Sequence, residues 1–142
     1  MDNYGNVILV IDISSNSIKV GLVSENLKLI HFSKDKIAII NEDIDGFIKS
    51  LNMDLLWNKI VTEVKRAVQK AENQNFNLIG ISSCAQRIAS VFLDRNGNVI
   101  YGGPNIDIRG LDSAYLIDDE FSEEDLFKIT GHSPSFLFPL PL

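Results

Sequence analysis

Three closely spaced, strand-like stretches near the start of the chain constrain its fold more than any other feature. They cover residues 7–13, 18–23 and 28–33. Only residues 14–17 and 24–27 separate them, whereas a crossover between parallel strands needs a dozen residues or more. The spacing therefore predicts three antiparallel strands. The first stretch, VILVIDI, is almost continuously apolar, which favours a strand buried on both faces in the middle of the sheet.

A long amphipathic segment follows at residues 54–72. Its apolar residues, among them Trp57, recur every three or four positions, which predicts a helix with this face in the core. Lys59 and Glu63 are four positions apart and are expected to pair on the solvent side. The apolar run at residues 78–82 completes a strand, helix, strand order, which predicts a strand parallel to an earlier one. The expected fold class is α/β, with a mixed sheet and a crossover helix.

The rest of the chain gives local patterns. Residues 35–50 show no clear period and stay unassigned. An Asn-Gly pair within residues 91–101 predicts a hairpin, because it supplies the positive φ that a tight turn needs. Residues 109–117 are expected to be helical. A further helix is predicted from an N-cap at Ser122 to its end at Gly131.

The composition is that of an ordinary globular domain, with 142 residues, 45% of them apolar and 23% charged. This length fits one domain and excludes two catalytic lobes. The net charge of −6 gives no general attraction to nucleic acid or anionic membranes. No apolar stretch fits a signal peptide or a membrane span, so a cytoplasmic location is expected.

Two further features of the composition bear on sites and on assembly. One cysteine, Cys84, and two distant histidines cannot form an internal disulfide or a tetrahedral zinc site. Cys84 is expected to be a small apolar filler, because no histidine lies nearby in the sequence to activate it. Residues 136–142 are apolar. We therefore expect the sequence to be cut from a longer chain and to self-associate as a homo-oligomer through exposed apolar surface.

The loop at residues 12–19 carries side chains suited to phosphate chemistry. Asp12 follows a buried strand, serines fill the turn, and Lys19 lies in the next strand. A carboxylate can hold Mg²⁺, hydroxyls and turn N–H groups can contact phosphate oxygens, and a lysine neutralises their charge. An ordinary polar hairpin turn explains the same residues, and local composition by itself favours that simpler interpretation.

The loop resembles the first phosphate motif of the FGGY carbohydrate kinases, Asp-x-Gly-Thr-Ser/Thr-Ser/Thr-x-Lys/Arg. Residues 79–97 and the Asn-x-Asp-x-Arg of residues 105–109 are similar to the sugar-binding region of that family, in the same order and spacing. The likeness covers essentially the whole chain. It implies an actin-like, ribonuclease H-like fold, with residues 1–142 forming the N-terminal portion of an incomplete first lobe. It also implies ATP-dependent transfer of the γ-phosphate to a hydroxyl of a sugar or polyol.

The resemblance implies a nucleotide site in the first hairpin. Asp12 would contribute to the Mg²⁺ and phosphate site, with the metal bound directly or through water. Ser15, Ser17 and Lys19 would face the phosphates of ATP.

The resemblance also implies a sugar site made by two loops. Gln86 and Arg87 match a pair that contacts substrate hydroxyls in the glycerol kinase branch, and Asp107 and Arg109 match the Asp-x-Arg that closes the sugar pocket. Taken singly, Arg87 and Arg109 are equally well explained as surface arginines paired with carboxylates. The general base and the adenine pocket of these enzymes lie beyond residue 142, so the chain alone is expected to be inactive.

Three positions depart from the family pattern. Ser14 replaces a glycine and adds a Cβ where the backbone approaches phosphate. Ile88 stands where the glycerol kinase branch has a glutamate, which removes an acceptor for a substrate hydroxyl. Asn105 replaces a common tryptophan, as in the branch that contains the autoinducer-2 kinases. Ser14 and Ile88 leave an alternative open, a non-catalytic actin-like module that binds nucleotide or a partner.

Overall fold

The structure is a computed structural model that describes residues 5–133. The chain divides into two compact units. The first contains the chain up to Ala38 together with Met53–Gln86, and the second contains Ile39–Asn52 and the chain from Arg87 onward. Each unit is described by itself.

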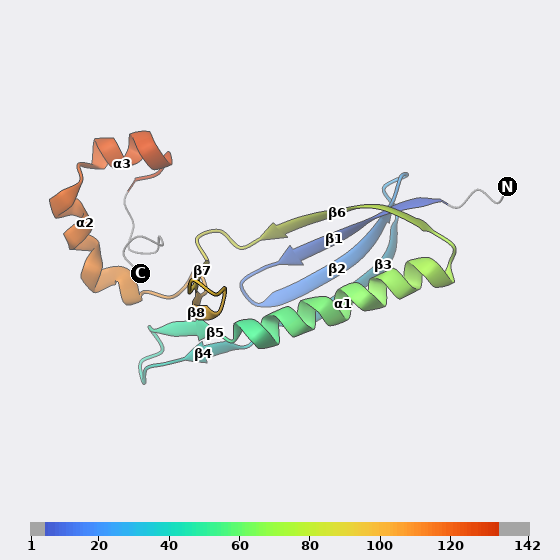
Figure 1. Cartoon of the computed structure of the whole chain (residues 1–142), viewed down its shortest axis with the longest axis horizontal. Helices are drawn as coiled ribbons and strands as arrows, with labels where there is room; N and C mark the ends of the chain where they lie inside the picture. The colour runs from blue at the N-terminus through green and yellow to red at the C-terminus, as the bar shows by residue number, and fades with distance from the viewer. Residues whose placement is uncertain (1–4, 134–142) are drawn as a thin grey trace. The chain divides into compact units, whose positions relative to one another are not determined.

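A four-stranded mixed sheet forms the first unit, with the order β3-β2-β1-β6 (Figure 1). The strands are β1 (Asn6–Ile13), β2 (Ser17–Ser24), β3 (Leu29–Lys36) and β6 (Asn77–Ala85). β1, β2 and β3 are successively antiparallel, and β6 is parallel to β1. The predicted meander, crossover and parallel strand are therefore confirmed.

After β3 the chain passes through the second unit and returns to the first unit in helix α1 (Met53–Asn73), which leads to β6. Helix α1 covers one face of the sheet (Figure 1). The core lies between this face and the helix. It contains fully or nearly buried residues from β1, β2 and α1: Val7, Leu9, Ile18, Val20, Leu22, Leu56, Ile60, Ala67 and Ala71. β1 is central, as predicted, but its burial on both faces is wrong, because Ile8 on the opposite face is 41% exposed.

The buried side of α1 is narrower than its apolar pattern indicates. Trp57 is 64% exposed, so its assignment to the core is wrong. The buried positions include Leu56, Ile60 and Glu63, which are three or four residues apart. Successive side chains of a helix are rotated by about 100°, so Trp57, the residue after Leu56, lies outside this buried stripe. The predicted pair of Lys59 with Glu63 is also wrong. Lys59 instead binds Asp35 of β3 at 3.0 Å, while Glu63 is buried and accepts a 2.5 Å hydrogen bond from Arg66.

The end of α1 is set by a left-handed residue. Asn75 has a φ of 56°, a conformation that asparagine tolerates better than most residues. The Phe76 N–H donates to the Ala71 carbonyl at 2.9 Å and the Asn75 N–H to Glu72 at 3.0 Å. This is the hydrogen-bond pattern of a Schellman motif, and it directs the chain into β6.

The second unit contains two short antiparallel ribbons. β4 (Ile39–Asn41) pairs with β5 (Lys49–Leu51), within the segment that stayed unassigned from the sequence. β7 (Ser90–Leu93) pairs with β8 (Val99–Gly103). Gly97 in the intervening turn has a φ of 85°, which confirms the predicted hairpin and its reason.

Three short helices follow β8. The predicted helix at residues 109–117 is a 3₁₀ turn, η1 (Arg109–Ser113), that continues into α2 (Ala114–Glu120). In α3 (Glu123–Thr130), Ser122 accepts a hydrogen bond from the Asp125 N–H and Gly131 adopts a left-handed φ of 73°, so both predicted caps are confirmed. The apolar stretch at residues 136–142 lies outside the described residues. Within residues 5–133, no helix combines the length and the apolar character that crossing a bilayer requires.

Candidate functional site

The carboxylate of Asp12 connects three strands of the first unit. Lys19 lies opposite Asp12 in the β1–β2 ladder, and its Nζ is 2.5 Å from Asp12 Oδ2. Cys84 lies opposite Asp12 on the other side, in β6, and its thiol donates to Asp12 Oδ1 at 3.5 Å. The hydrogen bonds from Lys19 and then Cys84 hold the pKa of Asp12 below its usual value, so Asp12 is an anion at neutral pH.

Cys84 is exposed, and its assignment as an apolar filler is wrong. Its strand, β6, lies at the edge of the sheet, and Cys84 is the next-to-last residue of that strand. The hydrogen bond to Asp12 raises the pKa of the thiol, because it places a negative charge next to the sulfur. Cys84 is therefore a neutral donor to Asp12 at neutral pH.

The turn between β1 and β2 is closed by its serines. The Ser14 N–H donates to the Ser17 carbonyl at 2.9 Å, and the two hydroxyl oxygens are also 2.9 Å apart. Ser17 is buried and Ser15 half-buried. Ser14 does not adopt a positive φ, so the replacement of the family's glycine introduces no left-handed strain here.

The first residue of the predicted sugar set lies beside this turn. The Gln86 N–H donates to the carbonyl of Ile13, the last residue of β1, at 2.8 Å. Since β1 and β6 are parallel, their carboxyl ends meet at one edge of the sheet, and Asp12, Ser14 and Gln86 gather there. Arg87, the next residue, is exposed and is the first residue of the second segment of the second unit.

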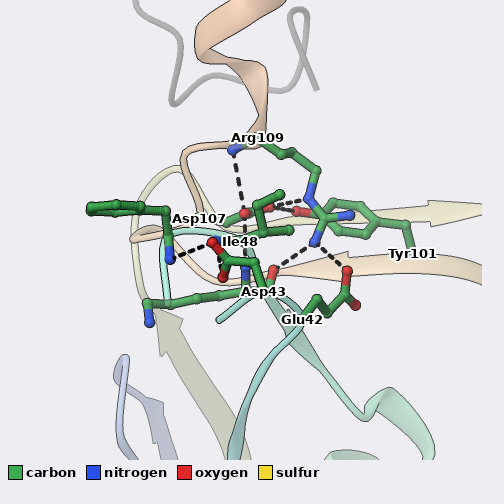
Figure 2. A network of polar contacts seen from close by, with 8 residues as sticks. Glu42, Asp43, Ile48, Tyr101, Asp107 and Arg109 are labelled. Carbon is green, nitrogen blue, oxygen red and sulfur yellow. Dashed lines mark hydrogen bonds and ion pairs between the residues drawn. The ribbon is translucent and has the colours of Figure 1, made fainter. Parts of the chain in front are cut away.

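In the second unit, Asp107 is the centre of a polar network (Figure 2). Its side chain is buried, with the residue only 1% exposed. Oδ1 accepts the Lys49 N–H at 3.0 Å and the Arg109 N–H at 3.4 Å, and Oδ2 accepts Arg109 Nε–H at 2.5 Å and the Tyr101 hydroxyl. A carboxylate has about four lone-pair positions, and these donors fill them.

Arg109 is held on several sides. Its Nη2 donates to Glu42 at 3.0 Å and to the Lys49 carbonyl at 2.9 Å. The guanidinium carbon lies 4.4 Å from the centre of the Tyr101 ring. Figure 2 shows the two side chains next to each other. Arg109 is thus paired with carboxylates, as the simpler interpretation expects, and one of them belongs to Asp107, the other residue of the Asp-x-Arg motif.

The network fixes the charges of its members. Burial by itself would raise the pKa of Asp107, but the hydrogen bonds from Tyr101, Lys49 and Arg109 outweigh burial and lower it. Burial, and then the hydrogen bond to Asp107, raises the pKa of the Tyr101 hydroxyl. At neutral pH the cluster therefore consists of an anionic Asp107, a neutral Tyr101 and a cationic Arg109.

The donor set of the first hairpin fits a magnesium ion that arrives with a nucleotide. Mg²⁺ in phosphate-transfer sites keeps several waters and uses one or two carboxylates together with phosphate oxygens. Asp12 supplies one such carboxylate. No group of three or more His, Cys, Asp or Glu side chains within the described residues is placed to hold a metal by itself.

Several members of these clusters were not predicted from the sequence. Glu42 binds Arg109 across 67 positions and lies in the segment without a clear pattern. Tyr101 has one local signal, the Gly102-Gly103 pair that follows it in β8. A Cβ on Gly103 would lie 2.0 Å from the Tyr101 hydroxyl oxygen, so the glycine leaves room for that hydroxyl to reach Asp107.

Comparison with protein families identifies a match for nearly the whole chain. Residues 7–141 match the model of the FGGY family of carbohydrate kinases, N-terminal domain. A Bacillus subtilis (strain 168) protein named "Putative sugar kinase YoaC" is 30% identical over 130 residues. These residues span 92% of the present chain and 26% of that relative, so the chain spans about a quarter of the relative's length.

Solved structures of sugar and polyol kinases have the same fold. A xyloylose kinase from Brucella ovis superposes with a TM-score of 0.79 at 18% identity, covering 96% of this chain and 28% of that one. A Plasmodium falciparum glycerol kinase with ADP gives a TM-score of 0.75 at 20% identity, covering 95% and 27%. These likenesses show the actin-like α/β fold, and the match over residues 7–141 shows the family. The chain belongs to the FGGY family of carbohydrate kinases.

Proposed function

We propose that this chain supplies the phosphate-binding hairpin and the sugar-binding loops of an ATP-dependent carbohydrate kinase. The observation that carries the proposal is the Asp12–Lys19 ion pair beside the Ser14–Ser17 turn, at the sheet edge where Gln86 begins the sugar-binding segment. Membership in the FGGY family supports the same reaction class. The acceptor is a hydroxyl of a sugar or polyol, and the donor is the γ-phosphate of ATP.

The hairpin binds the phosphates of ATP. Lys19 is about a third exposed and brings a positive charge to phosphate oxygens, while the half-buried Ser15 donates a hydroxyl hydrogen bond to them. The buried Ser17, whose hydroxyl is bound to that of Ser14, supports the turn from within. Asp12 would hold Mg²⁺ directly or through water, and a metal bound there would supply positive charge against the phosphates of ATP. Asp12 also keeps Lys19 in place when no nucleotide is bound.

The residues assigned to sugar binding are Gln86 in the first unit and Arg87, Asp107 and Arg109 in the second. Arginine donates to hydroxyl oxygens, and the glutamine amide both donates and accepts, which suits the adjacent hydroxyls of a polyol. The buried Asp107 contributes through Arg109, whose Nε it binds. The general base that accepts the hydroxyl proton belongs to a part of the kinase beyond residue 142.

The test uses the complete protein encoded by the reading frame that contains this sequence. Sugar-dependent ATP consumption is measured with glycerol, xylulose and gluconate, and the phosphorylated product is identified by ³¹P NMR. Lys19→Met is expected to raise the KM for ATP about tenfold or more, because a charge-assisted contact is lost. Arg109→Ala is expected to raise the KM for the sugar and to leave the KM for ATP unchanged.

Lys28→Met is the matched control, because Lys28 is exposed in the turn at the opposite end of β2. It should behave as the parent protein. ATP binding without transfer to any of the three acceptors would contradict the proposal and support the non-catalytic module. Equal effects of Lys19→Met and Lys28→Met would remove the hairpin from the nucleotide site.

A further inference from the structure

The hydrogen bonds of Arg109 leave one of its side-chain nitrogens available. Nε donates its single proton to Asp107, and Nη2 donates its two protons to Glu42 and to the Lys49 carbonyl. Nη1 makes no hydrogen bond to any of the residues that the structure describes. The side chain is 26% exposed, so this nitrogen is the group through which Arg109 can donate to a ligand.

Tyr101 supports this arrangement in two ways. Its ring lies under the guanidinium at 4.4 Å, a distance at which a cation and an aromatic face attract each other. Its hydroxyl donates to Asp107 Oδ2, the same oxygen that accepts Arg109 Nε–H. Gly103 leaves the space that the hydroxyl occupies. Tyr101 therefore restrains both the guanidinium plane and the carboxylate that orients it.

We propose that Tyr101 is a positioning residue, which acts with Asp107 to hold the Arg109 guanidinium so that Nη1 is directed to a hydroxyl oxygen of the bound sugar or polyol. This inference rests on the proposed function, because it assigns a substrate to Nη1. Tyr101 itself makes no contact with the substrate.

The physical reason is pre-organisation. A free arginine side chain loses rotamer entropy when it binds a ligand, and that loss weakens binding. Here the contacts with Asp107, Glu42, Lys49 and Tyr101 fix the side chain beforehand. Removing Tyr101 restores the mobility of Arg109 without removing its charge. The sugar should then bind more weakly, while ATP binding should not change.

The experiment compares Tyr101→Phe and Tyr101→Leu in the complete protein. Phenylalanine keeps the ring and removes the hydroxyl, and leucine removes both. We expect the sugar KM to rise about 3- to 10-fold for Tyr101→Phe and about 10- to 50-fold for Tyr101→Leu, with the ATP KM unchanged. A smaller rise in the sugar KM for Tyr101→Phe than for Tyr101→Leu would separate the contribution of the ring from that of the hydroxyl.

A double-mutant cycle shows whether Tyr101 acts through Arg109. In an Arg109→Ala background, Tyr101→Leu should change the sugar KM less than twofold, because no guanidinium is left to position. The matched control is Tyr115→Leu, since Tyr115 is 60% exposed on α2, and it should behave as the parent. An undiminished effect of Tyr101→Leu in the Arg109→Ala background would overturn the proposal.

A second measurement does not depend on catalysis. In arginine-selective ¹⁵N spectra, the Nε–H of Arg109 should exchange with water slowly, and Tyr101→Leu should speed that exchange at least tenfold. If the parent protein phosphorylates no sugar, the proposed function fails, and this exchange rate still decides the positioning role. Unchanged exchange in Tyr101→Leu would overturn that role.

Discussion

The charge of Asp107 depends on the hydrogen bonds that surround it. They lower its pKa in the folded chain, so the ionised form stabilises the fold above the unfolded pKa of about 4, and this contribution is lost as the pH falls through the folded pKa. We expect Asp107→Asn to lower the free energy of unfolding by about 2–3 kcal/mol at pH 7. The difference from the parent should shrink below about pH 4.

Urea unfolding of both proteins at pH 7 and at pH 3.5 measures this difference. Asp112→Asn serves as the control, because Asp112 is exposed in η1. It should unfold as the parent does at both pH values. A difference for Asp107→Asn that stays constant with pH would show that the ionisation of Asp107 does not stabilise the fold.

Leu27 is a residue whose backbone conformation does not suit it. It lies in the β2–β3 turn with a φ of 55°, and its side chain is 87% exposed. A branched side chain in the left-handed region costs about 1–2 kcal/mol, and glycine has no such penalty. Glycine also makes the unfolded chain more flexible, which offsets part of this gain in stability. Leu27→Gly should therefore raise the free energy of unfolding by about 0.5–1 kcal/mol. Asn26→Gly, without a positive φ to relieve, should lower it, and equal effects of the two changes would count against the argument.

At the scale of elements, α1 carries a charge on its buried side. Glu63 lies between Ile60 and Ala67 in the buried stripe, is 5% exposed, and is paired with Arg66. Replacing a buried paired charge by an apolar side chain of similar size is often neutral or stabilising, whereas removing its partner is destabilising. Glu63→Met should thus raise the free energy of unfolding by up to about 1 kcal/mol, and Arg66→Met should lower it by about 1 kcal/mol. Thermal unfolding followed by circular dichroism measures both, and shifts of the same sign would refute this account.

The elements also show how far local pattern predicts structure. The hairpin at Gly97 and both ends of α3 follow from residues within a few positions of one another, and the sequence predicted them. The burial of Glu63 and the exposure of Trp57 depend on how α1 lies on the sheet. The periodicity of apolar residues predicts that a helix forms, but its contact with the sheet decides which of those residues are buried.

At the scale of the whole molecule, the proposed function predicts whether the 142-residue chain consumes ATP by itself. The general base is expected beyond this sequence, so the chain should show no sugar-dependent ATP turnover, while the complete protein should show it. A coupled assay with both proteins measures this, and the Lys19→Met variant of the 142-residue chain is the control for contaminating kinases. Turnover by the 142-residue chain that Lys19→Met lowers would place the base within these residues.

The sequence by itself determined the antiparallel strands, the crossover to a parallel strand and the first hairpin. Short spacers force antiparallel strands, and Asp12 and Lys19 follow as neighbours once β1 and β2 form a hairpin. Only the tertiary structure decided that Cys84 would touch Asp12 and that Glu42 and Tyr101 would surround Arg109. The physical reason is that hairpins and caps are set by residues a few positions apart. The partner of a buried charge is whichever group the packed chain brings within hydrogen-bond reach, and for Arg109 that group comes from 67 positions away.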